Sequence, residues 1–258
     1  MAGDAAGMEP AAVVERTEGS GAWVVLCDHA DNRLPSRFGT LGLAPADLTA
    51  HFAWDPGALP VARALSAALD APLVRSTVSR LVIDCNREPS APDSIVEVGE
   101  ATPIPGNREL TPAERARRVA EAYAPYHAAV EETIAARLAG GVEPALVAIH
   151  TFTPAMHGRP RPWHVGVIFD DRDATLARAV AARLAADPDL HVGLNEPYSP
   201  ADRVYHTLER HGLRRGLPTV MIELRNDLVG DEAAARAWGD RLAGVLREAA
   251  LAPIIRGA

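Results

Sequence analysis

The sequence contains no lysine, so all 26 of its basic residues are arginine. Its 34 Asp and Glu residues give a formal net charge of -8, and the arginines form no basic block. Nucleic acids and anionic membrane surfaces are bound by clustered basic residues. We therefore expect neither as the main partner of this protein. Codon usage of the genome, together with a solvated surface, is enough to explain why arginine replaces lysine throughout.

Cysteine is scarce, and Cys27 and Cys85 each lie inside an apolar run. Such a pattern predicts no disulfide framework and favours a reducing compartment. No apolar run reaches the roughly 18 residues that would span a bilayer. Residues 1–21 lack the basic and apolar regions of a signal peptide. We predict a flexible leader over 1–21, a single domain over 22–258 and a cytoplasmic location.

Several catalytic and binding motifs are also missing. The chain has no H-E-x-x-H, no C-x-x-C, no Gly-rich phosphate loop and no G-x-S-x-G elbow. These motifs mark zinc proteases, zinc ribbons, nucleotide-binding proteins and serine hydrolases, respectively. Any chemistry must therefore come from residues that the fold brings together.

Short apolar runs that are typical of buried strands alternate with helical periodicity. The runs cover 23–27, 145–149, 165–169 and 219–224, with smaller fragments at 73–74 and 81–83. Helices are expected over 57–70, 111–138 (with Thr111 as N-cap), 173–186, 201–211 and 231–250, and a long loop over 88–108. This alternation predicts one α/β domain, with a mostly parallel or mixed central sheet and helices on both faces.

Two histidines directly follow buried strands, His29 after 23–27 and His150 after 145–149. Ligands of such sheets bind beyond the carboxyl ends of the strands, which predicts that His29, the 84–87 segment, His150 and Glu223 are neighbours. A rigid sheet edge can hold two imidazole nitrogens at about 2.0–2.1 Å from one zinc ion. The alternative is that each imidazole only bonds a backbone carbonyl. The remaining seven histidines are weaker signals, and most are interpreted as ordinary helix or loop residues.

Glu223 lies inside an apolar strand, where a carboxylate is costly to bury unless it is paired or faces a cleft. It is a candidate general base, and the alternative is a structural ion pair with Arg225. Arg87 and Asn86 close another predicted strand and offer donors to a carboxylate, with Arg80 as a second cation. The alternative is that these arginines lie on the surface or only hold a loop in place.

A series of segments resembles the N-formylglutamate amidohydrolase family, in its branch of predicted amidohydrolases. The matching segments keep their order from Cys27 to Val229. They are CDHADNRLP (27–35), SRLVIDCNR (79–87), IHTFTP (149–154), RPWHVG (161–166), NEPYS (195–199), RGLP (215–218) and IELRNDL (222–228).

The resemblance implies a fold like that of zinc carboxypeptidases and aspartoacylases. It further implies one zinc ion, a metal-bound water and hydrolysis of a small-molecule N-acyl amino acid. N-formyl-L-glutamate, an intermediate of histidine degradation, is the namesake substrate. His29 and His150 would be metal ligands and Glu223 would activate water. Substrate would contact Arg80, Asn86, Arg87, His164 and Arg225.

One position departs from the wider group, where the metal is held by an H-x-x-E pair and a later histidine. Asn32 stands where that glutamate is expected. We predict Asn32 as the third ligand, with Asp28 or Asp31 as alternatives. Two further hypotheses remain: a hydrolase of another amide, such as a carboxypeptidase or deacylase, and a metal-binding family member without activity. Homo-oligomerisation is left open.

Overall fold

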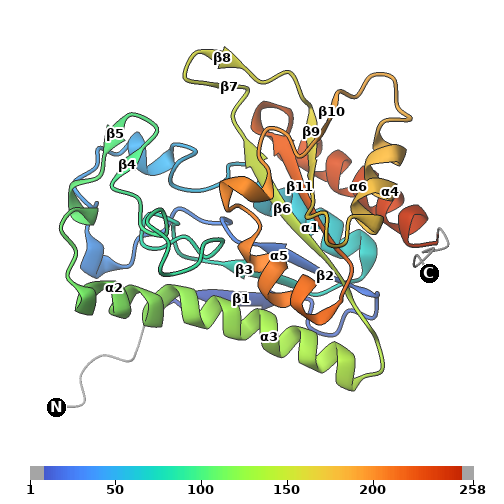
Figure 1. The fold of residues 1–258 in the computed structure, drawn as a ribbon, viewed down its shortest axis with the longest axis horizontal. Coiled ribbons are helices and arrows are strands. Elements are labelled where there is room, and N and C mark those ends of the chain that lie inside the picture. Colours follow the sequence, from blue (N-terminus) through green and yellow to red (C-terminus); the bar gives the residue numbers. More distant parts are fainter. Residues whose placement is uncertain (1–8, 252–258) are drawn as a thin grey trace.

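The computed structural model describes residues 9–251, and its centre is a seven-stranded sheet (Figure 1). The strand order is β1-β3-β2-β6-β11-β9-β10. The bounds are β1 (Ala12–Glu15), β2 (Trp23–Cys27), β3 (Leu73–Ser76), β6 (Ala145–Phe152), β9 (Val165–Ile168), β10 (Val192–Leu194) and β11 (Thr219–Arg225). Two short hairpins, β4 (Val98–Gly99) with β5 (Thr102–Pro103) and β7 (Ala155–Met156) with β8 (Arg159–Pro160), lie outside this sheet.

The sheet is mixed, as the alternation of elements predicts. Strands β3, β2, β6 and β11 run parallel to one another. Edge strand β1 is antiparallel to β3, and β9 is antiparallel to β11 but parallel to β10. The four central parallel strands end at the same edge of the sheet, which places their C-terminal loops together.

Helices cover both faces of the sheet (Figure 1). One face packs against α3 and α5, and the other against α1, α4 and α6. The helices are α1 (Ala58–Leu69), α2 (Pro112–Arg118), α3 (Ala124–Ala139), α4 (Thr175–Leu184), α5 (His206–His211) and α6 (Glu232–Leu251). The predicted single α/β domain is therefore confirmed.

The long helix predicted over 111–138 is present with one irregularity. Thr111 caps it as expected, because its hydroxyl accepts the backbone N–H of Glu114 at 3.1 Å. A π-helical turn, Val119–Tyr123, joins α2 to α3 just before Pro125. Since proline has no N–H to donate, a wider turn lets the helix continue past it.

Alternation along the central strands decides which side chains face which helices. Val147 and Ile149 pack on the α1 side, whereas Leu146 and Ala148 pack on the α3 side. The same period of two directs His150 toward the α3 and α5 side. Glu223 pairs with His150 across β11 and β6, so the two side chains lie side by side on one face.

Three sequence predictions of local structure need correction. Residues 12–15 form edge strand β1, so part of the predicted leader belongs to the domain, while residues 1–8 lie outside the described part of the chain. Residues 81–83 are turns: their side chains are apolar because they fill two small clusters beneath the loops. The helix expected over 201–211 is shorter, since α5 begins at His206 after a separate 3-10 turn.

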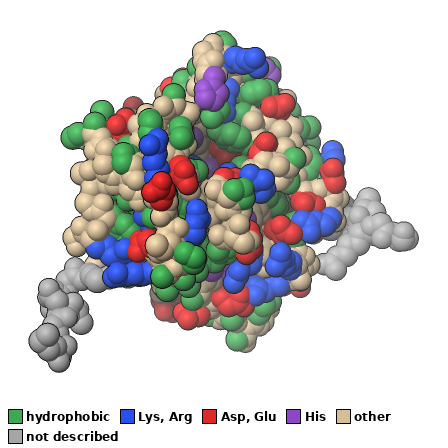
Figure 2. Space-filling model, turned by 60° about the vertical axis from the view of Figure 1, so that its left-hand side comes forward, with side chains coloured by type: hydrophobic (Ala, Val, Ile, Leu, Met, Phe, Trp, Pro, Cys, Tyr) green, Lys and Arg blue, Asp and Glu red, His purple; other side chains and the backbone are tan. Residues whose placement is uncertain are grey.

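Over residues 9–251, no helix combines the length and the apolar character that crossing a membrane requires. On the face shown in Figure 2, acidic, basic and hydrophobic side chains are interspersed.

Candidate metal centre

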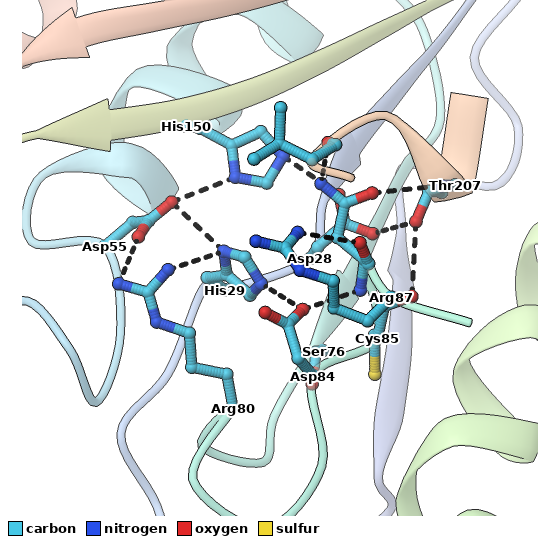
Figure 3. Close-up of polar contacts among 12 residues, drawn as sticks. Asp28, His29, Asp55, Ser76, Arg80, Asp84, Cys85, Arg87, His150 and Thr207 are labelled. Atoms are coloured by element: carbon cyan, nitrogen blue, oxygen red, sulfur yellow. Dashed lines mark hydrogen bonds and ion pairs between the residues drawn. The ribbon is translucent and has the colours of Figure 1, made fainter. Parts of the chain in front are cut away.

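Three buried side chains point their ligand atoms at one place near the carboxyl ends of the central strands (Figure 3). His29 follows β2, His150 lies in β6, and Asp55 lies in the loop before α1. One carboxylate oxygen of Asp55, Oδ2, lies 3.3 Å from Nδ1 of His29 and 2.9 Å from Nδ1 of His150. All three ligand atoms lie within 4.8 Å of one another.

The loop that carries Asp55 is fixed by backbone contacts. The N–H of Asp55 donates to the carbonyl of His29 at 3.0 Å, which ties this loop to the end of β2. Gly57 then adopts a φ of 85° against Val229, where an added Cβ would lie 2.5 Å from a Val229 methyl. The left-handed turn therefore needs glycine, and it starts α1 directly after Asp55.

Each histidine is held from its far side by a second carboxylate. Nε2 of His29 lies 2.7 Å from Asp84, and Nε2 of His150 lies 3.0 Å from Asp28. Asp28 in turn accepts a 2.6 Å hydrogen bond from the hydroxyl of Thr207 in α5. Histidines that bind metals commonly donate their other N–H to a carboxylate, which fixes the ring orientation and the tautomer.

This arrangement leaves both Nδ1 atoms with a lone pair. If Nε2 carries the proton toward Asp84 or Asp28, then each Nδ1 faces the Asp55 carboxylate without a hydrogen between them. Two acceptors facing each other at 2.9–3.3 Å repel unless a cation lies among them. At His29 the guanidinium of Arg80 is one such cation, 3.2 Å from Nδ1, whereas Nδ1 of His150 needs a second ring proton or a metal ion.

The charges of the site shift its pKa values in opposite directions. Burial lowers the pKa of His150, but Asp28 and Asp55 outweigh burial and hold that pKa well above its ordinary value. The pKa of His29 is also raised, since Asp84 and Asp55 outweigh burial and the nearby Arg80. Burial raises the pKa of Asp55, yet Arg80 and the two histidines bring it well below its ordinary value.

The residues fit a divalent metal such as zinc. Two imidazole nitrogens and one carboxylate oxygen are the donors of many catalytic zinc sites, which leave a fourth position open. Ligands placed tetrahedrally at about 2.0–2.1 Å from an ion are about 3.3 Å apart. The observed separations of 2.9 and 3.3 Å are close to that spacing.

Glu223 borders the same place and is buried, with its Oε2 atom accepting no hydrogen bond from residues 9–251. Burial raises the pKa of Glu223 to about 7, with His150 opposing this rise and Asp55 adding to it. A carboxylate whose pKa is near neutral can both accept and return a proton at physiological pH. The ion pair with Arg225 is not formed: that guanidinium binds Asp227 at 2.8 Å.

Arg80 lies against the other side of the metal-ligand group. Its guanidinium is 3.2 Å from Nδ1 of His29 and 3.1 Å from Oδ1 of Asp55. It also donates to the backbone carbonyls of His51, Phe52 and Trp54. Burial and the charge of Arg80 lower the pKa of His51 to about 4, so this imidazole stays neutral.

These residues lie in a cavity of about 250 Å³. Its wall includes Val98 and Gly99 from β4 and Met156 from β7, so both small hairpins border it. Further lining residues are His29, His51, Phe52, Asp55, Arg80, Asp84, Asn86, Arg87, Asp93, Val96, Glu100, His150, Thr151, Tyr198, Val204 and Glu223.

Two predicted substrate-binding residues line this cavity but use their polar atoms within the protein. Asn86 donates to the carbonyl of Val204 and accepts the N–H of Thr207 at 3.0 Å. Arg87 donates to Asp93 at 3.0 Å and to two backbone carbonyls at 3.0 Å each. Both side chains therefore shape the cavity wall by holding the 203–207 segment in place.

Two other predicted substrate-binding residues, His164 and Arg225, are not among the side chains that line the cavity. Nδ1 of His164 accepts the backbone N–H of His191 at 3.0 Å. The backbone of Arg225 donates to the carbonyl of His164 at 3.1 Å. Both residues stabilise the edge of the sheet beside β9.

Asn32, the predicted third metal ligand, is not among the three convergent side chains, and neither are its alternatives Asp28 and Asp31. The side-chain amide of Asn32 donates to the carbonyl of Leu48 at 2.8 Å, and Asp31 accepts the N–H of Arg33 at 2.9 Å. Asp28 approaches His150 from the side away from Asp55. Among residues 9–251, the carboxylate that joins the two histidines is that of Asp55.

Nothing in the sequence predicts Asp55 as a site residue, whereas Asp84 is predicted near the site as part of the 84–87 segment, without a role of its own. Asp55 precedes Pro56 and Gly57 at the start of a helix, where an aspartate is read as a turn or cap residue. Asp84 ends an apolar run directly before the predicted substrate-binding residues Asn86 and Arg87. The weak signal for each was a carboxylate directly beside buried apolar sequence.

The fold and this group of side chains define an α/β protein with a His–Asp–His site of the kind that holds a catalytic metal. The sequence model of the family described as N-formylglutamate amidohydrolase matches residues 21–229. The chain belongs to this amidohydrolase family. No curated protein matches this chain.

Several solved structures resemble this one, and they include these two. A gene product of Agrobacterium tumefaciens is 43% identical, with a TM-score of 0.91, and the match covers 94% of this chain and 95% of that chain. An N-formylglutamate amidohydrolase from Ralstonia eutropha is 21% identical, with a TM-score of 0.70 and coverage of 93% and 99%. The second likeness shows a shared fold.

Proposed function

We propose that this protein is a zinc-dependent hydrolase of the amide bond of an N-acyl amino acid, with N-formyl-L-glutamate as the first substrate to test. One observation carries the proposal. The two Nδ1 atoms and Asp55 converge beside the unpartnered Oε2 of Glu223. A metal-ligand group next to a carboxylate of raised pKa is the arrangement that amide hydrolysis needs.

Each protein residue then has a defined task. A divalent metal held by His29, Asp55 and His150 would supply a Lewis acid and lower the pKa of a water molecule. Glu223 takes a proton from the attacking water and returns it to the departing amine, which its pKa of about 7 permits. The guanidinium of Arg80 lies where it can stabilise negative charge on the amide oxygen.

The family supports the choice of reaction, because its model describes an amidohydrolase of N-formylglutamate. The cavity of about 250 Å³ suits a small molecule better than a polypeptide. The alternative hydrolases of the sequence analysis would act at the same residues on a short peptide or another amide.

Zinc-loaded protein is expected to release formate and L-glutamate in equal amounts from N-formyl-L-glutamate, one water being consumed per bond. A panel of N-acyl amino acids and short peptides separates the two kinds of substrate. Zinc bound at one ion per chain without turnover of any member would leave a metal-binding protein without activity. Failure to bind zinc would contradict the metal-dependent reaction itself.

A further inference from the structure

Two arginines of this structure are almost fully buried, and they differ in what surrounds them. Arg118 in α2 is 2% exposed. It pairs with Glu114 at 3.1 Å, donates to the side chain of Asn107 at 2.7 Å and donates to two backbone carbonyls. Its charge and its donors are satisfied within the protein, so this guanidinium is structural.

Arg161, which directly follows β8, is 8% exposed and has no such partners. Its guanidinium contacts the hydroxyl of Thr153 at 3.5 Å, the limit of a hydrogen bond, and the thioether of Met156. Within residues 9–251 it forms no ion pair with an Asp or Glu. A buried cation whose contacts are a thioether and the hydroxyls of Thr153 and Tyr198, with no carboxylate among them, is costly unless an anion joins it.

The position of Arg161 relates it to the cavity. Its guanidinium lies 4.8 Å from the ring centroid of Tyr198 and contacts Met156. Tyr198 and Met156 both line the cavity, together with Glu223. Arg161 itself is not among the lining residues and lies behind these two side chains that it contacts. Met156 is unbranched and can change rotamer at little cost, which would open a path to the charge.

Two arginines line the cavity, and the N–H donors of both are already engaged within the protein, although the charge of Arg80 still acts on the cavity. Arg80 serves Asp55 and three backbone carbonyls, and Arg87 serves Asp93 and two more. Asp93 and Glu100 add negative charge to the same wall. A substrate carboxylate that enters the cavity therefore finds its least committed guanidinium at Arg161.

We propose that Arg161 binds a carboxylate of the substrate, with Met156 moving aside to admit it. The inference rests on the proposed hydrolysis of N-acyl amino acids and names a substrate-binding residue for it. Guanidinium and carboxylate form two parallel charge-assisted hydrogen bonds, which fix orientation as well as adding affinity. The carboxylate is either the α-carboxylate or the side-chain carboxylate of the amino acid.

The test measures binding rather than turnover. Zinc-loaded Glu223→Gln protein is titrated with N-formyl-L-glutamate and with N-formyl-L-glutamine by calorimetry, alone and combined with Arg161→Met, Arg161→Lys or Arg178→Met. Arg178 is the matched control: its guanidinium also lies 4.8 Å from an aromatic centroid, that of Phe169, but it is exposed and pairs with Asp171.

We expect Arg161→Met to weaken binding of N-formyl-L-glutamate about 10- to 100-fold, the usual loss for a charge-assisted pair. Arg161→Lys should restore part of it, and Arg178→Met should leave it within about twofold. If the glutamine analogue loses as much affinity, Arg161 binds the α-carboxylate. If only the glutamate ligand loses affinity, Arg161 binds the side-chain carboxylate.

A second readout separates binding from folding. Arg161→Met removes an unpaired buried charge, so its melting temperature should stay equal or rise, whereas Arg118→Met should melt earlier. Equal affinities for wild-type and Arg161→Met backgrounds overturn the inference. Tight binding that depends on Arg161, combined with no turnover by the zinc-loaded protein that keeps Glu223, would overturn the proposed hydrolysis. Arg161 would then remain a carboxylate-binding residue. Binding of neither ligand would overturn both.

Discussion

Two pairs of buried histidines lie in this domain, and their surroundings shift the pKa of the rings in opposite directions. His29 and His150 meet at 4.9 Å between ring centroids, and His127 of α3 stacks on His211 of α5 at 5.1 Å. All four rings are at most 4% exposed. Burial acts on every one of them, yet the pKa is raised in the first pair and lowered in the second.

The second pair is complete as two neutral rings. Nε2 of His127 donates to the carbonyl of Cys85 at 2.9 Å, and Nε2 of His211 is 2.8 Å from Nδ1 of His127. One proton per ring satisfies these contacts. Burial, with the neighbouring His211, lowers the pKa of His127 to about 3, and burial with Arg210 lowers that of His211 to about 3.

The first pair is incomplete as neutral rings, because three carboxylates surround it and both Nδ1 atoms face one of them. The difference teaches that burial of a histidine does not by itself identify a metal ligand. The surrounding charges do: with both rings neutral, three carboxylates and the single charge of Arg80 leave an excess of negative charge, which second ring protons or a bound cation would balance.

The largest expected difference between the two histidine pairs is in metal binding. His150→Ala should abolish stoichiometric zinc binding and turnover, since one of three ligands is gone. His127→Ala should keep its zinc while losing about 1–3 kcal/mol of unfolding free energy for the unpaired partners. Elemental analysis after dialysis and urea unfolding measure the two effects. Equal zinc content in both variants would end the distinction between the pairs.

Glu223→Gln separates the base from the ligands. The substitution keeps shape and removes the carboxylate that handles the proton, so kcat should fall about 10²- to 10⁴-fold. Zinc content should stay at the wild-type value because Glu223 is not among the three convergent side chains. Steady-state assays with elemental analysis measure both; unchanged kcat would make Glu223 a structural residue.

Asp28→Asn tests the carboxylate behind His150. Zinc affinity should weaken about 10- to 100-fold, the usual effect of removing a carboxylate that orients a ligand. Competition with a chelator of known affinity gives the value. Asp31→Asn is the matched control from the same loop, because Asp31 bonds only the Arg33 backbone there. Equal effects of the two would show that general loop charge, not the His150 contact, matters.

The smallest change per pH unit concerns acid stability and the second pair. The pKa of His127 is depressed from about 6.5 to about 3, so its contribution to stability is full above pH 6.5 and is lost as pH falls toward 3. Unfolding free energy should decline by about 1.4 kcal/mol per pH unit for this proton. His127→Gln should remove that slope in urea titrations between pH 7.5 and 4.5. Parallel pH curves would contradict the neutral ring.

The sequence predicted the fold class well because its signals are local. Runs such as Val24–Leu26 and 145–149 mark strands, and the helix from Thr111 is marked by its cap. The failures have tertiary causes. Residues 81–83 are apolar because loops cover them, and β1 is short and charged at its end because it lies at an edge. Neither cause is visible in a window of neighbouring residues.

By itself, the sequence determined two histidines at the ends of buried strands and one glutamate inside another. Strand periodicity and strand register place these three groups together in any sheet of this order. Only the tertiary structure decided the partners: Asp55 and Asp84 reach His29 from 26 and 55 residues further along the chain. Loops carry both carboxylates, and loop paths depend on packing against the whole domain rather than on local pattern. The charge balance that distinguishes His29 and His150 from His127 and His211 therefore exists only in the folded chain.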